Sequence, residues 1–456
     1  MTSCNLREPI PLNWRLPPGR FNGRNLAVSS KKPARLFFPQ RKALGLDVDQ
    51  SLSPELLEKA TCLGTILSSF PQAHAASARL LEQVLGIKRL QRLTERIGVE
   101  RVAQRDVQTE AFGHLSLMQK QAAPRGVKAP EVVAIMPDGG RLQLCSENEK
   151  SRTHWHEYKA GCLKILESEP SAKDPCPEVP EMFLQRVRIE KLTREIGQKA
   201  AEVEAPDPES PTSSGSPSFP LPTAGVPLPE PPKVLSSDVI ATRRNSKEFG
   251  KMLAARAWSL GMFASSRKAY VGDGSSWIWT IWQQQFKPFG FVPILDIIHA
   301  LTYVYAAATA GQTRERGWGV YVRWITWIWQ GQVTQVLAEL SQRQQDLGLP
   351  SDEDGSTSAR RIVSEALTYL QNQSGKMDYP QYRRQGLPIT SSHIESTVKL
   401  LNHRLKGSEK FWSESGAEAL LQLKADTLSD TGHWEHFWHT RPNTMTGTRP
   451  SARSKT

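Results

Sequence analysis

The stretch RKAYVGDGSSWIW (residues 267–279), followed by PILDIIHALTYVYAAA (residues 293–308), decides the fold. Each half begins with a short run of β-branched, aromatic or other apolar residues, which predicts a strand. The first run stops at Gly272 and Asp273, the second stops at Asp296, and a helical pattern follows each. Strands that end in acids and lead into helices are typical of an α/β sheet with polar groups at the strand ends. We therefore expect an α/β fold in which acids meet at one edge of the sheet and can hold a divalent cation.

The charge of the chain indicates a polyanionic partner. The 456 residues allow two or three domains, and the formal net charge is +12. Such a balance favours nucleic acid first and an anionic membrane second. Residues 1–44 contain nine Lys and Arg against one acid, and residues 441–456 are also basic. Basic ends of this kind are expected to be solvated arms that can lie along phosphates.

Cysteine usage and hydropathy predict a soluble cytoplasmic protein. The five cysteines are scattered and never in CxxC spacing, which favours a reducing compartment over disulfides or a structural zinc site. The N-terminus has no signal-peptide pattern. The most apolar stretch, residues 318–340, is interrupted by Arg323, Gln330 and Gln332 and is too polar for a membrane span.

Periodicity divides the N-terminal half of the chain. Residues 53–98 predict three short helices, the third of which carries the basic residues Arg92 and Arg96. These helices are either a helix-turn-helix variant that binds DNA or a small bundle with a solvated basic face. From residue 130 the period changes to two, which predicts antiparallel strands at 132–136, 142–144 and 154–166.

Three acids are the candidate chemical groups, although each has a structural explanation. Asp138 precedes two glycines between two apolar runs, as in a hairpin turn. Asp273 has the position of a helix N-cap, and Glu395 follows Ser392 at the spacing of a capping box. Their order is more informative than any one of them, because acids on a first strand, a later strand and a late helix are arranged as in a ribonuclease-H-like core. Three such carboxylates can hold two Mg²⁺ ions, or Mn²⁺ in their place.

The helix predicted at residues 392–406 has two different faces. Apolar residues form one stripe, while Glu395, Lys399, Asn402 and Lys406 share another face. An acid followed by lysines fits a metal ligand beside a DNA backbone, and a surface pair between Glu395 and Lys399 is the alternative. The tryptophans near residues 277–329 are expected mainly to pack in the core, with base stacking as the alternative for a few.

Several motifs, in this order, resemble one family. They are PDGGRLQ (137–143), HWHEYKAGC (154–162), VGDGSSWIW (271–279), ILDIIHAL (294–301), YRRQGLPITSSHIESTVKLLNHRLK (382–406), FWSESGAEALLQLKA (411–425) and HWEHFW (433–438). Together they resemble bacterial insertion-sequence transposases of the ISKra type, DDE enzymes related more distantly to Mutator-like transposases. The resemblance extends over roughly residues 53–438, and the proline-rich stretch interrupts it.

The resemblance implies a set of site residues. Asp138, Asp273 and Glu395 would be the catalytic, metal-binding triad, with Mg²⁺ as the cofactor and Mn²⁺ as a substitute. Asp296 and His299 are similar to the D/C-x-x-H element that follows the second acid in this family. His299 would orient a phosphate or protonate a leaving group, with an ordinary helix histidine as the alternative.

Composition and periodicity, together with the resemblance, imply an organisation of the chain. The expected parts are a basic extended arm (1–50), a helical candidate DNA-binding region (51–128), the first part of a ribonuclease-H-like core (129–204), a disordered proline-rich insertion (205–235), the second part of the core (236–310), an all-helical insertion (311–377), the catalytic helix with C-terminal helices (378–440) and a disordered basic tail (441–456).

The expected function is that of a DDE transposase, a polynucleotidyl transferase of bacterial cytoplasm that acts on double-stranded DNA. It would cleave at the element ends and transfer the freed 3′-OH into target DNA, as a homo-oligomer when two ends are paired. The candidate phosphate-binding residues are Arg383, Arg384, Lys399, Lys406, Arg92 and Arg96. The alternatives are a catalytically inactive, domesticated or decayed transposase that only binds DNA, and a structural protein that uses its Trp-rich helices for partner contacts.

Overall fold

The structure, a computed structural model, describes residues 52–81, 84–145, 154–196 and 231–441. The chain divides into two units, of which one comprises residues 1–57 and 441–456 and the other residues 58–440. The sheet and the helices that cover it belong to the second unit. The predicted N-terminal arm, most of the proline-rich insertion and nearly all of the basic tail lie outside the described residues.

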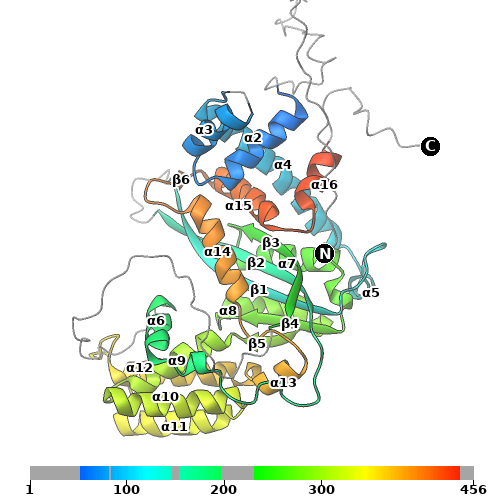
Figure 1. Ribbon diagram of the computed structural model, residues 1–456. Coiled ribbons are helices and arrows are strands. Elements are labelled where there is room, and N and C mark those ends of the chain that lie inside the picture. The colour runs from blue at the N-terminus through cyan, green and yellow to red at the C-terminus, as the bar shows by residue number, and fades with distance from the viewer. Residues whose placement is uncertain (1–51, 82–83, 146–153, 197–230, 442–456) are drawn as a thin grey trace, which may run out of the picture. The chain divides into compact units, whose positions relative to one another are not determined.

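The fold is α/β, as the sequence predicts, and is built on one mixed sheet (Figure 1). The strands are β1 (Val132–Leu144), β2 (Trp155–Glu167), β3 (Lys233–Thr242), β4 (Arg267–Gly272), β5 (Val292–Leu295) and β6 (Phe411–Trp412). Their order is β3-β2-β1-β4-β5, and β6 pairs with β1. The first three strands are antiparallel neighbours, whereas β4 and β5 run parallel to β1.

The predicted hairpin at Asp138 is wrong, because β1 continues through Asp138 and the two glycines after it. A Cβ on Gly140 would lie 2.2 Å from the ring of Tyr158, its partner on β2. The glycine therefore provides room for a cross-strand ring instead of forming a turn. The third strand of the antiparallel set is β3, which the sequence did not predict and which begins before the expected end of the proline-rich insertion.

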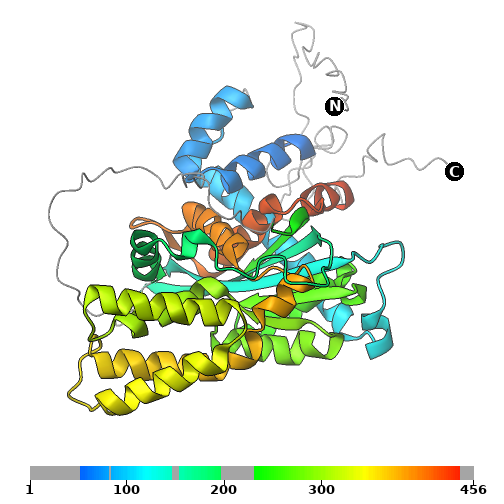
Figure 2. The ribbon, with the colours of Figure 1, turned by 60° about the horizontal axis from the view of Figure 1, so that its bottom comes forward.

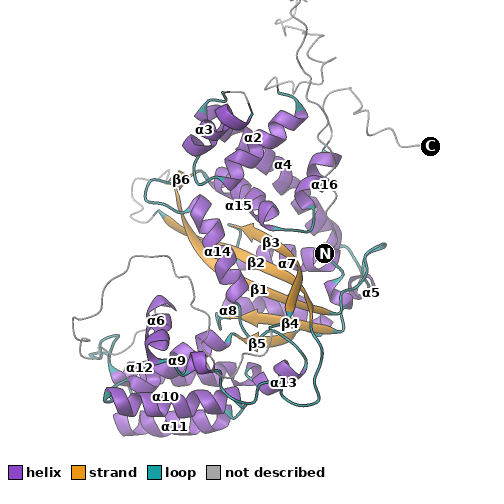
Figure 3. Cartoon of the chain, in the orientation of Figure 1, coloured by secondary structure: helices purple, strands orange, loops and turns teal. Residues whose placement is uncertain are grey.

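Helices cover both faces of the sheet (Figure 3). On one face, Val133 and Tyr270 share a buried core with Phe249 of α7 (Ser246–Ser259) and Ile278 of α8 (Ser276–Ile281). On the other, α14 (Ser392–Leu405) packs against β1 and β2, and α15 (Glu414–Leu428) packs against β3. The sheet is therefore the central layer of a three-layer unit.

The N-terminal region is helical as predicted, but its third helix is longer than expected and a fourth, short helix follows it. The helices are α2 (Pro54–Ile66), α3 (Phe70–Leu80), α4 (Ile87–Gly113) and α5 (Leu117–Gln121). The expected stop at Gly98 is wrong, since a Cβ there would lie 2.5 Å from Ala419 of α15 and the glycine allows the two helices to approach closely. Arg101 and Arg105, further along α4, are buried and form ion pairs with Asp426 and Glu418. These contacts hold one side of α4 along α15, whereas Arg92, nearer the start of α4, is exposed.

Residues 311–377 are helical where they have regular structure, as expected. The helices are α10 (Arg314–Trp329), α11 (Val333–Leu347) and α12 (Ala359–Gln373), which Figure 2 shows side by side in yellow-green to gold. Helices α10 and α12 pack against α9 (Ile297–Thr309), α11 packs against α10 and α12, and α6 (Arg186–Ile196) also contacts α9. Trp324 and Trp329 are buried in this group, which confirms the packing prediction for these two residues.

The remaining elements are short. They are α13 (Tyr379–Arg384), α16 (His433–Thr440), the 3₁₀ turns Glu181–Phe183, Met262–Ala264, Lys287–Phe289 and Ser374–Lys376, and a π-helical turn, Trp282–Phe286. Among the described residues, no helix combines the length and the apolar character that crossing a membrane requires.

Candidate active site

Three aspartates lie at the same level of the sheet, Asp138 within β1 and Asp273 and Asp296 directly after β4 and β5. The parallel ladder pairs Ile135 of β1 with Tyr270 of β4, and Asp138 and Asp273 each lie three residues further along. The next ladder pairs Gly272 of β4 with Leu295 of β5, directly before Asp273 and Asp296. The expectation that the acids meet at one edge of the sheet is therefore met by Asp273 and Asp296, with Asp138 beside them inside β1.

The carboxyl group of Asp138 lies in an environment that disfavours its charge. Burial, together with the nearby carboxylates of Asp273 and Glu395, raises its pKa to about 7, although the N–H of Gly139 and the imidazole of His299 oppose the shift. The Gly139 N–H donates to the Asp138 carboxylate over 2.6 Å. Asp138 is thus within electrostatic reach of every other residue predicted for the catalytic site.

Asp296 joins the beginnings of two helices. It is fully buried, and its Oδ1 accepts a hydrogen bond of 2.8 Å from the Ile298 N–H in the first turn of α9. Its Oδ2 accepts from the hydroxyl of Ser391 and, over 3.1 Å, from the Ser391 N–H. Ser391 is the N-cap of α14, so the capping-box alternative for Glu395, with Ser392 as the cap, is wrong. Asp296 therefore fixes the end of α14 that carries Glu395.

The closest group of potential metal ligands is Asp296, His299 and Glu395. Among the residues that the structure describes, one ligand atom from each of these three lies within 4.8 Å of the other two. Burial raises the pKa of Glu395, as does the charge of Asp296, while His299 and Lys399 lower it. The structure thus brings Glu395 and His299 together, whereas Asp138 and Asp273 lie outside this tight group.

A tight turn holds Asp273 after β4. Its Oδ1 accepts from the Ser275 N–H over 2.8 Å, and its Oδ2 accepts from the Ser275 hydroxyl over 3.0 Å. The N-cap of α8 is Ser275, so the N-cap alternative for Asp273 is wrong. Both carboxylate oxygens keep further lone pairs for a cation.

Two residues of α12 also reach this turn. The Tyr369 hydroxyl donates to the carbonyl of Asp273 over 2.7 Å, and Gln373 Nε2 donates to the carbonyl of Gly274 over 3.1 Å. Sequence reasoning missed both residues. They lie 96 and 99 positions from their partners, and no local pattern distinguishes them from other polar residues of a helix.

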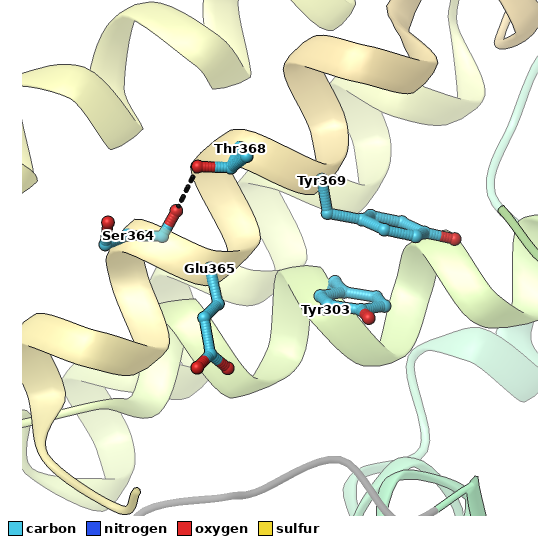
Figure 4. A pocket seen from close by; sticks show the side chains of 5 residues that line it. All are labelled: Tyr303, Ser364, Glu365, Thr368 and Tyr369. Carbon is cyan, nitrogen blue, oxygen red and sulfur yellow. Dashed lines mark hydrogen bonds between the residues drawn. The ribbon is translucent and has the colours of Figure 1, made fainter. Parts of the chain in front are cut away.

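A pocket of about 380 Å³ opens next to these contacts, between α9 and α12. Its lining residues are Tyr303, Ser364, Glu365, Thr368 and Tyr369 (Figure 4). The rings of Tyr303 and Tyr369 are stacked, with centroids 3.7 Å apart and planes inclined by 10°. The ring that contacts the Asp273 turn is therefore itself held by a second ring.

Arg383 does not lie where a phosphate-binding residue is expected. Its guanidinium is buried, forms a two-pronged ion pair with Asp174 and donates over 2.9 Å to the carbonyl of Trp329. It also lies 4.1 Å from the centroid of the Trp329 ring. This placement contradicts a DNA contact by Arg383, because the N–H groups of its guanidinium are buried inside the protein. Arg384 is half-buried and donates to Gln381 Oε1 over 3.1 Å.

The other basic candidates are more accessible. Lys399, Lys406 and Arg92 are exposed, and Arg96 is half-buried. Lys399 and Lys406 extend from the helix that carries Glu395, and the ammonium group of Lys406 lies 5.4 Å from the centre of the Trp155 ring. These two lysines are therefore on an accessible surface that continues from the candidate site.

Comparison with known proteins adds no family assignment. No protein-family model matches the sequence, and no curated protein matches it with significant similarity. The resemblance to transposases therefore depends on the sequence motifs alone, and the function is a proposal based on those motifs and on the geometry of the site.

Proposed function

We propose that this protein is a metal-dependent DNA transposase of the DDE type with a ribonuclease-H-like core. The supporting topology is the order β3-β2-β1-β4-β5, with three antiparallel strands followed by two parallel ones. The observation that carries the proposal is geometric: Asp138 and Asp273 lie at one level of adjacent parallel strands, and Glu395 lies beside Asp296, which follows the next strand.

The donor set suits a hard divalent cation. Asp138, Asp273 and Glu395 supply carboxylate oxygens, which Mg²⁺ and Mn²⁺ prefer, and Asp296 and His299 stand beside them. Burial and, after it, the charges of neighbouring acids raise the pKa values of Asp138 and Glu395, so a bound cation would stabilise their ionised forms. When bound, Mg²⁺ would supply activation of the attacking oxygen and charge stabilisation at the leaving oxygen.

The residues of the chain would then hold and orient the substrate. His299, which lies beside Glu395, would hold a phosphate oxygen or give a proton to a leaving oxygen. Asp296 would keep Glu395 in position through Ser391. Lys399 and Lys406 would bind backbone phosphates next to the reacting one.

The proposed reaction has two steps. Water attacks a phosphodiester at the element end, the P–O3′ bond breaks, and the departing strand keeps a 3′-OH. That 3′-OH then attacks a phosphodiester of the target, displaces its 3′ oxygen and loses its own proton. No bond between protein and DNA is needed, so no nucleophilic Ser or Tyr is assigned.

The proposal is tested by incubating the full chain with DNA that contains its gene's own flanking sequences, with Mg²⁺ or Mn²⁺ and with EDTA. We expect metal-dependent cuts at the flanks that leave 3′-OH ends, and no cuts with Asp273→Asn. The control is Asp352→Asn, which changes an exposed aspartate of a loop. Binding of these DNAs without cutting by the wild type would contradict the proposal and favour a DNA-binding protein without catalysis.

A further inference from the structure

We propose that Tyr369 and Gln373 are positioning residues for Asp273, so that α12 sets the affinity of the metal site. The inference rests on the proposed function, because it concerns a ligand of the proposed metal site. It assigns a role to the helices between the second and third acids beyond that of an insertion.

The contacts are consecutive on both partners. Tyr369 and Gln373 are four residues apart, so both lie on one face of α12. Their side chains donate to two successive carbonyls, those of Asp273 and Gly274, over 2.7 and 3.1 Å. Two bonds to adjacent peptide units fix both the position and the rotation of the turn, which one bond would not do.

The shape of the turn requires close contact with α12. Gly274 has a φ of +99°, a region in which glycine is strongly favoured. A Cβ at this position would lie 2.5 Å from the Tyr369 ring, so the ring packs directly on the glycine backbone. Ser275 holds the Asp273 carboxylate from the other side. The ligand is therefore held at its backbone by α12 and at its carboxylate by the turn itself.

Tyr369 is in turn fixed by α9. The Tyr303 ring is stacked on it, and Tyr303 lies four residues after His299, on the same face of α9. Burial raises the pKa of the Tyr369 hydroxyl well above its ordinary value, so the hydroxyl keeps its proton and remains a donor. The helix that presents His299 thus also supports the residue that positions Asp273.

A positioning role has a different signature from a purely structural one. Loss of a bond that only packs α12 would lower the free energy of unfolding and leave metal binding unchanged. Loss of a bond that orients a ligand would weaken metal binding, and excess metal would restore cleavage. Partners that orient metal ligands typically change metal affinity by about 10- to 100-fold when removed.

The test uses the full chain and Mn²⁺, with free Mn²⁺ measured by electron paramagnetic resonance in the absence of DNA. We expect Tyr369→Phe, which keeps the stacked ring, to weaken Mn²⁺ binding by about tenfold. Gln373→Met should act in the same direction and provides a second variant if the first does not fold. Cleavage by both variants should return to within about twofold of the wild type at saturating Mn²⁺.

Matched controls remove similar groups elsewhere. Tyr321→Phe removes a buried hydroxyl that donates over 2.9 Å to the Phe183 carbonyl, and Gln371→Met changes an exposed amide of α12. Both should bind Mn²⁺ as the wild type does.

Two results would overturn the inference. If Asp273→Asn weakens Mn²⁺ binding but Tyr369→Phe and Gln373→Met do not, the positioning role is wrong and the proposed metal site stands. If Asp273→Asn also binds Mn²⁺ like the wild type, Asp273 is no ligand, and the proposed function fails together with the inference.

Discussion

Asp138 makes the stability of the metal-free protein depend on pH. Its pKa is raised from 3.8 to about 7, so the folded state binds a proton that the unfolded state releases between these pH values. The associated stability is present below pH 3.8 and is lost as the pH rises through about 7. We expect the free energy of unfolding without metal to fall by about 2 kcal/mol between pH 5 and pH 8, because one pKa unit is worth about 1.4 kcal/mol and Asp138 keeps partial contact with water.

Urea unfolding of the wild type and Asp138→Asn at these two pH values measures the effect. The variant, which has no carboxyl group to ionise, should lose less stability than the wild type. Mn²⁺ at pH 8 should stabilise the wild type and leave the variant nearly unchanged, since binding to the folded state stabilises it by mass action. Equal pH dependence in the two proteins would show that Asp138 ionises normally.

Arg383 is expected to act on stability and not on DNA. Arg383→Met would leave Asp174 without its buried partner and remove the hydrogen bond to the Trp329 carbonyl. We expect a loss of about 1–3 kcal/mol in the free energy of unfolding, because the Trp329 carbonyl loses its donor while the half-buried Asp174 keeps access to water. The salt dependence of DNA binding should not change. A weaker dependence of DNA affinity on salt concentration in the variant would contradict this prediction and show that Arg383 binds a phosphate.

The contrast between Arg383 and the acids shows what single residues disclose in the sequence. Asp273 and Asp296 were identifiable because each ends an apolar run, and strand ends gather at an edge of a sheet. Arg383 and Arg384 are adjacent and look alike in the sequence. Their different burial depends on Asp174, which lies 209 residues from Arg383 and has no local signal.

At the scale of elements, the beginning of α14 is held by one buried carboxylate. Ser391→Ala removes the hydroxyl that donates to Asp296 and keeps the backbone N–H that also donates. We expect a loss of about 1.5–3 kcal/mol in the free energy of unfolding, typical for a hydrogen bond to a charged group. Weaker Mn²⁺ binding should accompany it, because the first turn of α14 carries Glu395.

The matched control for Ser391→Ala is Ser392→Ala, which changes the exposed neighbour. Thermal unfolding and Mn²⁺ titration of both variants make the comparison. Indistinguishable behaviour would mean that the Asp296–Ser391 contact does not position α14.

Elements were predictable where local pattern and tertiary role agree. Strands β4 and β5 and helix α9 follow directly from the opening motif. The prediction was wrong at two glycines, a hairpin turn at Gly140 and a helix end at Gly98. Each provides room for a distant partner, Tyr158 or Ala419, so a signal that usually marks a turn or a helix end marks close packing instead.

At the scale of the whole molecule, the charge predicts salt-sensitive DNA binding. Each neutralised phosphate contributes about −0.9 to the slope of log affinity against log salt on duplex DNA. We expect the double variant Lys399→Ala, Lys406→Ala to reduce the magnitude of this slope by about two, with stability nearly unchanged because both lysines are exposed. Fluorescence anisotropy with one labelled duplex over a range of salt concentrations measures the slope. An unchanged slope would show that Lys399 and Lys406 do not bind DNA phosphates.

The arrangement of the whole site could not be predicted from local sequence patterns. The motifs identified the acids of the proposed triad, and strand order explains why two of them meet. The turn around Asp273, however, depends on two helices, α9 and α12, whose stacked tyrosines lie 66 positions apart in the sequence (369 − 303). Pairing across such distances is a property of packing, and no local pattern encodes it.

The most direct test of the central claim, that Asp138, Asp273 and Glu395 form one metal site, is a Mn²⁺ titration of the wild type and of Asp138→Asn, Asp273→Asn and Glu395→Gln. We predict that each single substitution weakens binding by at least about tenfold. We also predict that the double variant Asp138→Asn, Glu395→Gln loses less affinity than the sum of the single losses in free energy, as ligands of one site do. Wild-type binding in any of the three single variants would contradict the account.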